Sequence, residues 1–201
     1  MADFIHHYEA GSDQRRPLLL LHGTGGDEHD LVPLGRRLAP EAALLSPRGK
    51  VLENGMPRFF RRFGEGRFDV EDIKLRAAEL AAFVDEARER YGIAQPLALG
   101  FSNGANIAAA MMLLAPQTLA GAVLLRAMTP LVPDELPDLG GKPVLILSGS
   151  ADPMIPAEDA TRLAGLLRGA GATVRHEVLP AGHSLTRADL DIATDWLAQA
   201  G

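Results

Sequence analysis

Short, continuous apolar runs recur along this sequence, and they alternate with segments of helical periodicity. The runs at 17–22 and 143–148 are almost entirely apolar, which is typical of strands buried on both faces of a sheet. Apolar residues recur every three or four positions from Asp69 to Tyr91, which predicts an amphipathic helix with Asp69 as N-cap and Gly92 at its end. Alternating buried strands and helices predict an α/β fold with a mostly parallel sheet and helices on both faces.

The rest of the chain continues this alternation. Further apolar runs predict a short edge strand at 4–8 and strands at 42–46, 96–101, 121–125 and 174–179. Helical spacing predicts helices near 31–38, 102–114 and 156–167, and a last helix that begins after Thr186. Two connections, 47–68 and 126–142, are longer than these elements explain, and long irregular loops in a compact domain are usually functional. We expect a single domain over residues 1–201, because this length is ample for one core.

The composition argues against several classes of function. The net charge is −6 with acids and bases interspersed, which argues against nucleic acid as a partner. The chain has no cysteine, so it can hold neither a disulfide nor a thiolate metal site. Residues 1–8 lack the pattern of a signal peptide, and the longest apolar run, 107–115, is far shorter than the roughly 20 residues that span a bilayer. We therefore expect a cytoplasmic protein without stable membrane anchoring.

One predicted strand runs into the pentapeptide Gly100-Phe101-Ser102-Asn103-Gly104, and small and apolar residues continue into the next helix. A serine at a sharp strand-to-helix turn has an exposed hydroxyl, and the free N–H groups of the new helix point toward a reacting carbonyl. Ser102 is therefore the candidate nucleophile, with glycines at the two positions where strand and helix approach closely. The alternative is an ordinary turn serine, because this pattern also arises by chance in a chain with 21 glycines.

Three further segments that could carry chemistry also follow predicted strands. A glycine-rich turn occupies 23–26, and Asp152 and His183 each come shortly after a later strand. The carboxyl ends of parallel strands share one edge of a sheet, so we expect these segments to meet Ser102 there. The chain order of serine, acid and histidine is the order found in α/β-hydrolases.

The chemistry of a serine nucleophile assigns a role to each of these residues. A serine hydroxyl needs a neighbouring base, which predicts that His183 removes the proton of Ser102. The imidazole needs a carboxylate that fixes its tautomer, which predicts Asp152 in that role. Negative charge grows on the attacked carbonyl oxygen, and the backbone N–H groups of Thr24 and Asn103 are the candidate oxyanion hole.

Each of these residues also has a simpler interpretation. Asp152 precedes a proline and can start a turn by bonding its own backbone, and His183 can be a capped loop histidine. The turn at 23–26 can be a phosphate loop, although it lacks the Gly-Lys-Ser/Thr ending of a nucleotide loop. Residues 27–30 can be a metal cluster, although acids that open a helix are favoured by its dipole. Because serine, acid, histidine and glycine-rich turn occur together, we expect a serine mechanism without metal or cofactor.

The chain as a whole resembles a known family. It looks like the small carboxylesterase/phospholipase branch of the α/β-hydrolases, which includes acyl-protein thioesterases and bacterial esterases without a cap domain. Within that branch, three segments resemble bacterial hydrolases of the hydroquinone-resistance type: 22–28, 46–49 and 54–62. The resemblance implies an α/β-hydrolase fold without a separate cap domain, the same triad and serine-hydrolase activity. It does not fix the natural substrate.

The connection at 47–68 combines aromatic side chains with six basic residues and only two acidic ones. This patch predicts a substrate with an apolar or aromatic acyl part and an anionic group, bound by Arg58, Phe59 and Phe60. Phe101 and Arg126 are further candidates for substrate contact. The alternatives are that the phenylalanines pack the loop down, that the arginines extend into water or pair with acids, that Arg126 forms an ion pair, and that Phe101 packs beside the nucleophile.

Together these patterns predict a serine hydrolase that cleaves small carboxylic esters through an acyl-enzyme. A thioesterase or lysophospholipase is the alternative, since it would use the same residues on a different acyl group. A ligand-binding protein that keeps the fold without turnover is disfavoured, because all three catalytic side chains are present. The expected partner is a small-molecule ester, and the sequence leaves the oligomeric state open, a homodimer included.

Overall fold

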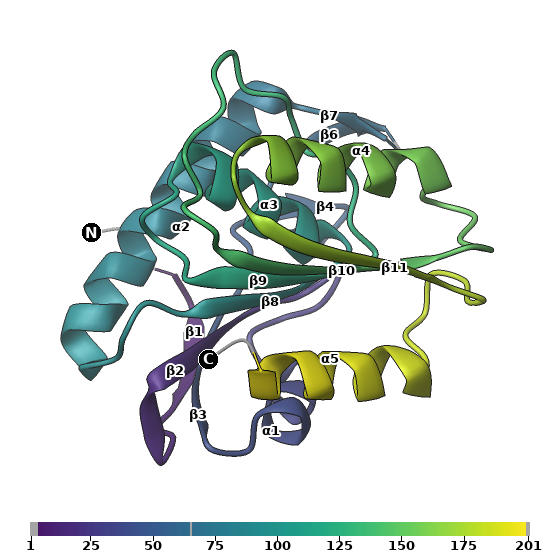
Figure 1. Cartoon of the computed structure of the whole chain (residues 1–201). Helices are drawn as coiled ribbons and strands as arrows, with labels where there is room; N and C mark the ends of the chain where they lie inside the picture. The colour runs from purple at the N-terminus through teal and green to yellow at the C-terminus, as the bar shows by residue number, and fades with distance from the viewer. Residues whose placement is uncertain (1–3, 65, 200–201) are drawn as a thin grey trace.

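A seven-stranded sheet forms the centre of the computed structural model, which describes residues 4–64 and 66–199 (Figure 1). Its strands lie in the order β1-β3-β2-β8-β9-β10-β11. Their bounds are His6–Glu9 for β1, Asp13–Leu21 for β2, Ala42–Pro47 for β3, Leu97–Phe101 for β8, Gly121–Leu125 for β9, Pro143–Gly149 for β10 and Thr173–Leu179 for β11. All neighbours pair in parallel except β1, which runs antiparallel to β3 at the edge. The predicted parallel sheet and edge strand are confirmed.

Helices cover both faces of the sheet (Figure 1). One face carries α2 (Val70–Tyr91), α3 (Asn103–Leu114) and α4 (Ala157–Gly169), and the other carries α1 (Val32–Leu38) and α5 (Arg187–Gln199). Two separate apolar cores result, one between the sheet and each helical layer. The predicted α/β architecture is confirmed, and no cap domain covers the sheet within the described residues.

Successive leucines of β2 explain why its sequence is continuously apolar. Leu19 and Leu21 pack in the core that includes α2, α3 and α4, whereas Leu18 and Leu20 pack in the core that includes α1 and α5. Side chains of a strand alternate between faces, so a central strand covered on both sides must be apolar at every position. Each fully buried leucine contributes about 1.5–3 kcal/mol to the free energy of unfolding.

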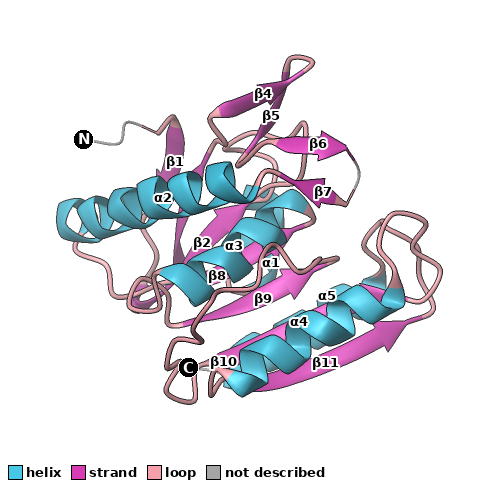
Figure 2. Ribbon diagram, turned by 90° about the horizontal axis from the view of Figure 1, so that it is seen from above, coloured by secondary structure: helices cyan, strands magenta, loops and turns pink. Residues whose placement is uncertain are grey.

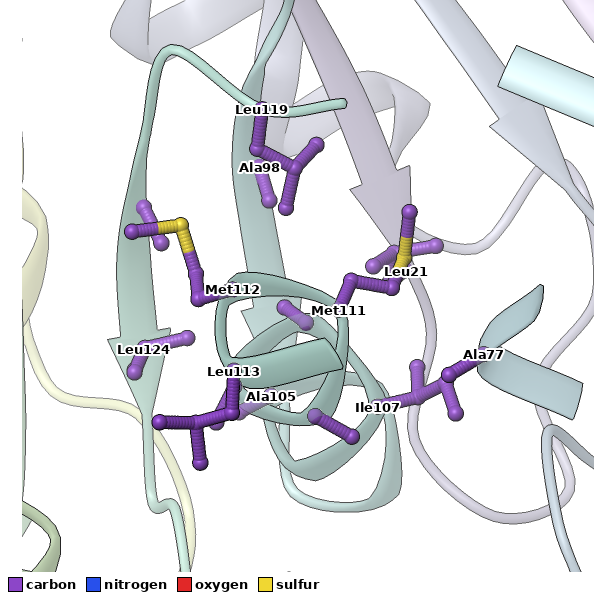
Figure 3. Packing of buried hydrophobic residues seen from close by; sticks show 14 of the residues in the cluster. Leu21, Ala77, Ala98, Ala105, Ile107, Met111, Met112, Leu113, Leu119 and Leu124 are labelled. Carbon is purple, nitrogen blue, oxygen red and sulfur yellow. The ribbon is translucent and has the colours of Figure 1, made fainter. Parts of the chain in front are cut away.

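Helix α3 is apolar on all sides because it lies between the sheet and α2. Its side chains Ile107, Met111 and Met112 are fully buried, and Figure 3 shows them pointing in different directions around the helix toward neighbouring elements. A helix enclosed in this way has little freedom to shift. The residue that precedes it, Ser102, therefore starts from a firmly held position.

The ends of α2 agree with the sequence-based expectation. The Asp69 carboxylate accepts the N–H of Asp72 at 3.1 Å, and Gly92 takes the left-handed conformation with φ 65° while its N–H donates to the carbonyl of Arg88.

Among the described helices, none combines the length and the apolar character that a membrane span requires.

The segment after β3 is more ordered than predicted. We expected an irregular loop over 47–68, but it contains two small hairpins (Figure 2), formed by β4 (Val51–Glu53), β5 (Met56–Arg58), β6 (Arg62–Gly64) and β7 (Arg67–Phe68). The turn of the first hairpin is Asn54-Gly55 with φ values of 53° and 81°. Asn-Gly is the favoured dipeptide for this turn, so the signal was present in the sequence. The other long connection, 126–142, contains neither helix nor strand, as expected.

Candidate active site

Ser102 lies at the sharp turn between β8 and α3. Its backbone has φ 52° and ψ −113°, a conformation that residues with side chains rarely adopt. Strand and helix approach so closely that a Cβ at Gly104 would lie 1.9 Å from the carbonyl oxygen of Leu21, and a Cβ at Gly100 would lie 2.6 Å from that of Gly104. Space therefore requires both glycines of the pentapeptide.

His183 connects Ser102 with Asp152. The distance from His183 Nε2 to Ser102 Oγ is 3.1 Å, and the distance from His183 Nδ1 to Asp152 Oδ2 is 2.8 Å. Because an ionised carboxylate only accepts hydrogen bonds, Nδ1 carries the proton in this arrangement and Nε2 is free to accept the serine O–H. The structure thus brings together three side chains that lie 81 and 31 positions apart in the chain.

Asp152 is fixed on its other side by the turn that it starts. Its Oδ1 accepts the backbone N–H groups of Met154 at 2.8 Å and Ile155 at 3.3 Å, and the side chain is buried. The turn-forming interpretation of Asp152 is therefore correct, and it does not compete with the contact to His183. One carboxylate oxygen holds the turn while the other holds the imidazole.

Thr24 and Asn103, whose backbone N–H groups are the candidate oxyanion hole, line the same pocket as Ser102. Neither N–H donates a hydrogen bond to any described residue. The Thr24 N–H belongs to the same planar peptide as the Gly23 carbonyl and points the opposite way. That carbonyl accepts the His22 Nδ1–H at 2.6 Å and the Gly26 N–H at 3.1 Å. Two hydrogen bonds on one side of the peptide therefore fix the direction of the N–H on the other.

His22 is the buried support of this turn. Its Nδ1 donates to the Gly23 carbonyl, so its Nε2 is unprotonated and accepts the Gly49 N–H at 3.0 Å. Burial lowers the pKa of His22 below its usual value, although the hydrogen bond with Gly23 opposes this effect. The neutral imidazole thus joins the end of β2 to the segment that follows β3.

The pocket above Ser102 has a volume of about 340 Å³. Its apolar wall comes from Phe68, Phe101, Met128, Met154 and Ile155. Its polar side includes Arg58, Arg62 and the exposed Asp30, together with the residues already described. The lining thus carries two guanidinium groups and one carboxylate beside a serine, which suits a small molecule with an apolar part and an acceptor or anionic part.

Arg58 is the buried one of the two pocket arginines. Its Nη1 donates to Thr24 Oγ1 and to Glu53 Oε2, both at 2.9 Å, and its Nε donates to the Phe60 carbonyl at 3.2 Å. Arg62 donates through Nε to the same Glu53 carboxylate. The hydrogen bond from Arg62, together with the charge of Arg58, lowers the pKa of Glu53 although burial opposes it. A single carboxylate therefore balances two guanidinium groups.

Three of the residues predicted to contact substrate lie away from the pocket above Ser102. Phe59 and Phe60 are 2% and 0% exposed and belong to the core, because they anchor the hairpin segment against the body of the domain. Arg126 is also buried, and it forms an ion pair with Asp189 instead of lining the pocket. Phe101 and Arg58, by contrast, do line the pocket. The alternatives that the phenylalanines pack the loop down and that Arg126 forms an ion pair describe the structure.

Sequence reasoning missed four residues of the apolar wall: Phe68, Met128, Met154 and Ile155. Three of them follow β9 or β10 within a few positions, so the rule that ligands bind beyond the carboxyl ends of parallel strands could have found them. Phe68 lies in β7, just before α2, and the sequence gives no comparable signal for it.

Comparisons with known proteins agree with this geometry. Residues 8–200 match the family described as Phospholipase/Carboxylesterase. MhqD of Bacillus subtilis strain 168, a protein named as a hydrolase, is 46% identical over 197 residues, which are 97% of this chain and 98% of MhqD. A Bacillus cereus carboxylesterase of known structure is 44% identical with a TM-score of 0.96, covering 98% of this chain and 95% of that one. YahD, solved with malic acid, is 30% identical with a TM-score of 0.93, covering 99% and 100%. The chain therefore belongs to the phospholipase/carboxylesterase family of α/β-hydrolases and is an enzyme of the carboxylesterase type.

Proposed function

We propose that this enzyme hydrolyses small carboxylic esters through an acyl-enzyme on Ser102, with His183 as base and Asp152 as its orienting carboxylate. The observation that carries this proposal is the hydrogen-bonded series from Asp152 Oδ2 through the imidazole to Ser102 Oγ, which opens into the pocket. A serine hydroxyl placed against an unprotonated imidazole nitrogen is what nucleophilic attack at neutral pH requires.

The reaction divides into two balanced halves. As Ser102 Oγ attacks the ester carbon, His183 Nε2 takes the hydroxyl proton, and the negative charge on the carbonyl oxygen is met by the N–H groups of Thr24 and Asn103. Collapse of this tetrahedral species breaks the ester C–O bond, and the alcohol leaves with the proton held by His183. A water molecule then attacks the acyl-serine with the same base, and the acid and the free Ser102 are regenerated.

The pocket supports a small substrate with an anionic group. Its volume of about 340 Å³ lies near the lower end of the roughly 300–1,000 Å³ that is common for ligand pockets. Arg58 and Arg62 line it, and guanidinium groups bind carboxylates through paired hydrogen bonds. YahD, whose solved structure contains the dicarboxylic acid malic acid, supports the same substrate class. The proposed substrate is an ester that carries a carboxylate on its acyl or alcohol part.

Replacing the nucleophile tests the reaction itself. Ser102→Ala should keep the fold but lower kcat toward an aryl ester by a factor on the order of 10⁴–10⁶. A fluorophosphonate probe should label the wild-type protein at Ser102 and not the variant. The matched control is Ser148→Ala, because Ser148 Oγ lies 3.0 Å from His176 Nε2 in a second serine–histidine pair outside the pocket. Wild-type labelling at another residue, or full activity in Ser102→Ala, contradicts the proposal.

Three neighbouring arginines test the substrate class. Arg58→Gln and Arg62→Gln should each lower kcat/KM for a carboxylate-bearing ester by about tenfold or more relative to its neutral analogue. Arg61→Gln is the control, because Arg61 points to Asp69 and Asp72 and does not line the pocket. If the ratio of kcat/KM for the carboxylate-bearing ester to kcat/KM for its neutral analogue were the same in all three variants, Arg58 and Arg62 would not recognise the carboxylate. The alternative activities are tested by measuring kcat/KM of the wild-type protein for an acyl-thioester and for a lysophospholipid beside the esters.

A further inference from the structure

Arg126 lies at the end of β9, and its guanidinium is hydrogen-bonded in every direction. Nε donates to the Gly182 carbonyl at 2.9 Å, and Nη2 donates to the Ser184 carbonyl at 3.2 Å. Nη1 donates to the Leu147 carbonyl at 3.2 Å, and both Nη atoms donate to Asp189, at 2.7 and 2.8 Å. A guanidinium has five N–H donors, so each has an acceptor.

The two loop carbonyls that Arg126 holds belong to the residues on either side of His183. Gly182 precedes the histidine and Ser184 follows it, so the two bonds hold the peptide group before the His183 Cα and the peptide group after Ser184. The Nη1 bond to Leu147 ties the same guanidinium to β10, the strand that leads to Asp152. One side chain thus fixes the histidine loop relative to the strand that carries its partner.

The backbone of Arg126 is strained to reach this position. Its φ is 56°, a value that a residue with a long side chain rarely adopts. Among the described non-glycine residues, only Asn54 and Ser102 share a positive φ, and Asn54 lies in a hairpin turn. Ser102 and Arg126 each donate their N–H to the neighbouring strand, to Leu125 and Leu147 respectively, before the chain turns away. The strain therefore occurs at the ends of two adjacent strands, beside the same site.

The charge of Arg126 is kept in the interior by Asp189, which opens α5. Both side chains are 0% exposed, and Asp189 also accepts the Thr186 N–H and hydroxyl, at 2.7 and 2.8 Å. A buried ion pair is weak evidence for stability, because apolar residues of similar volume often serve the fold as well. The ion pair acts here by fixing geometry, because Arg126 and Asp189 both hydrogen-bond to the segment 182–186 that contains His183.

We propose that Arg126, held by Asp189, is a positioning residue for His183: it clamps the backbone carbonyls of the residues before and after the histidine and so sets the distance from Nε2 to Ser102 Oγ. This inference rests on the proposed function, in which His183 is the base. An error of about 1 Å in the placement of a reacting group can cost roughly 100-fold in rate. Loss of the clamp should therefore slow the chemical step and leave substrate affinity unchanged.

Arg126→Ala tests the clamp directly. Its kcat should fall roughly 100-fold while KM stays within about threefold of wild type. A fluorophosphonate should react more slowly with the variant but should reach the same final number of labelled sites, which shows that the molecules are folded. Added guanidinium ion should restore part of kcat by entering the vacated space. The proposal is overturned if Arg126→Ala has the kcat of the wild type. It is also overturned if fewer of its molecules are labelled but those molecules react at the wild-type rate.

Arg126→Lys decides the matter if the alanine variant does not fold. Lysine keeps the charge opposite Asp189, but its single nitrogen cannot span both loop carbonyls and the carboxylate. Its kcat should fall about tenfold or more, with KM unchanged. Arg187→Ala is the matched control, because Arg187 lies in the same region but is 88% exposed and pairs with Asp191. Wild-type kcat in folded Arg126→Lys contradicts the clamp.

Hydrogen exchange separates this inference from the proposed function. In Arg126→Lys, the amides of residues 181–186 should exchange faster than in wild type, while those of β2 and β8 should not change. This result does not depend on any substrate. If the wild-type protein fails to hydrolyse esters but amide exchange in the histidine loop is faster in Arg126→Lys, the proposed function fails. The structural role of Arg126 in holding that loop then stands. If the wild-type protein is active and the variant shows neither effect, the clamp alone fails.

Discussion

At the scale of single residues, close approach of backbone atoms explains which positions tolerate no change. Gly104 lies where α3 begins against the end of β2, and a Cβ there would meet the backbone oxygen of Leu21. A backbone atom of a central strand cannot move aside as the end of a flexible side chain can. The glycine two residues after the nucleophile is thus required by space and not by the conformational freedom of glycine.

Two glycine-to-alanine substitutions make this argument testable. Gly104→Ala should lower the free energy of unfolding by about 1–3 kcal/mol or more through overpacking, and should lower kcat by shifting Ser102. Gly165→Ala should instead raise the free energy of unfolding by about 0.5–1 kcal/mol, because Gly165 lies within α4 and a Cβ there meets nothing within 4 Å. Urea unfolding of both variants checks the opposite signs, and a stable, fully active Gly104→Ala contradicts the argument.

At the scale of elements, hydrogen bonds and core contacts join the hairpin residues 51–64 and 66–68 to the body of the domain. The Phe59 N–H donates to Asn103 Oδ1 at 2.8 Å, and the Arg61 N–H donates to Asp72 Oδ2 at 2.7 Å. Phe60 lies in the core beside Phe68, with ring centroids 5.2 Å apart. The segment is thus tied both to the first residue of α3, beside the nucleophile, and to the first turn of α2.

This anchoring predicts that the neighbouring phenylalanines act on stability in different ways. Phe60→Ala should lower the free energy of unfolding by about 3–5 kcal/mol, because it leaves a cavity in the core. Phe63→Ala should change it by no more than about 0.5 kcal/mol, because Phe63 is 70% exposed. Thermal or urea unfolding measures both. A Phe60→Ala protein of wild-type stability with a weakened affinity for aromatic esters would restore the substrate-contact interpretation.

At the scale of the whole molecule, the buried His22 and the half-buried His176 connect stability with pH. Burial lowers the pKa of His22, and burial followed by the charge of Arg168 lowers that of His176. In the unfolded chain a histidine titrates near pH 6.5. Between that pH and the lower folded values the unfolded state binds more protons, so this contribution to stability is complete above about pH 7 and is lost as the pH falls.

The free energy of unfolding should therefore stay constant from about pH 8 to 7 and decrease below about pH 6.5, with a slope of at most about 1.4 kcal/mol per pH unit for each histidine. His22→Gln should make this slope shallower, because it removes one of the two histidines whose pKa is lowered in the folded protein. Urea unfolding in steps from pH 7.5 to 5 measures both proteins. If the free energy of unfolding fell with pH at the same slope in wild type and in His22→Gln, His22 would not contribute to the pH dependence.

The sequence itself predicted the elements well and the partners of long side chains poorly. Strand and helix positions follow from local periodicity, so the apolar strands and the ends of α2 agree with the prediction. Ser102, Asp152 and His183 each follow a strand, and parallel topology alone brings such positions to one edge, where the structure joins them. Their catalytic roles remain predictions. The first hairpin was missed because its Asn-Gly turn lay inside a segment expected to be irregular.

What the sequence determined by itself was the fold class, the order of the elements and the residues at the carboxyl ends of the strands, because backbone propensity and burial act over short distances along the chain. Only the tertiary structure decided that Phe59 and Phe60 anchor a hairpin and that Arg126 pairs with Asp189, 63 positions away. The physical reason is that a long side chain chooses its partner from all groups within reach, and only the packing of distant segments determines which groups those are.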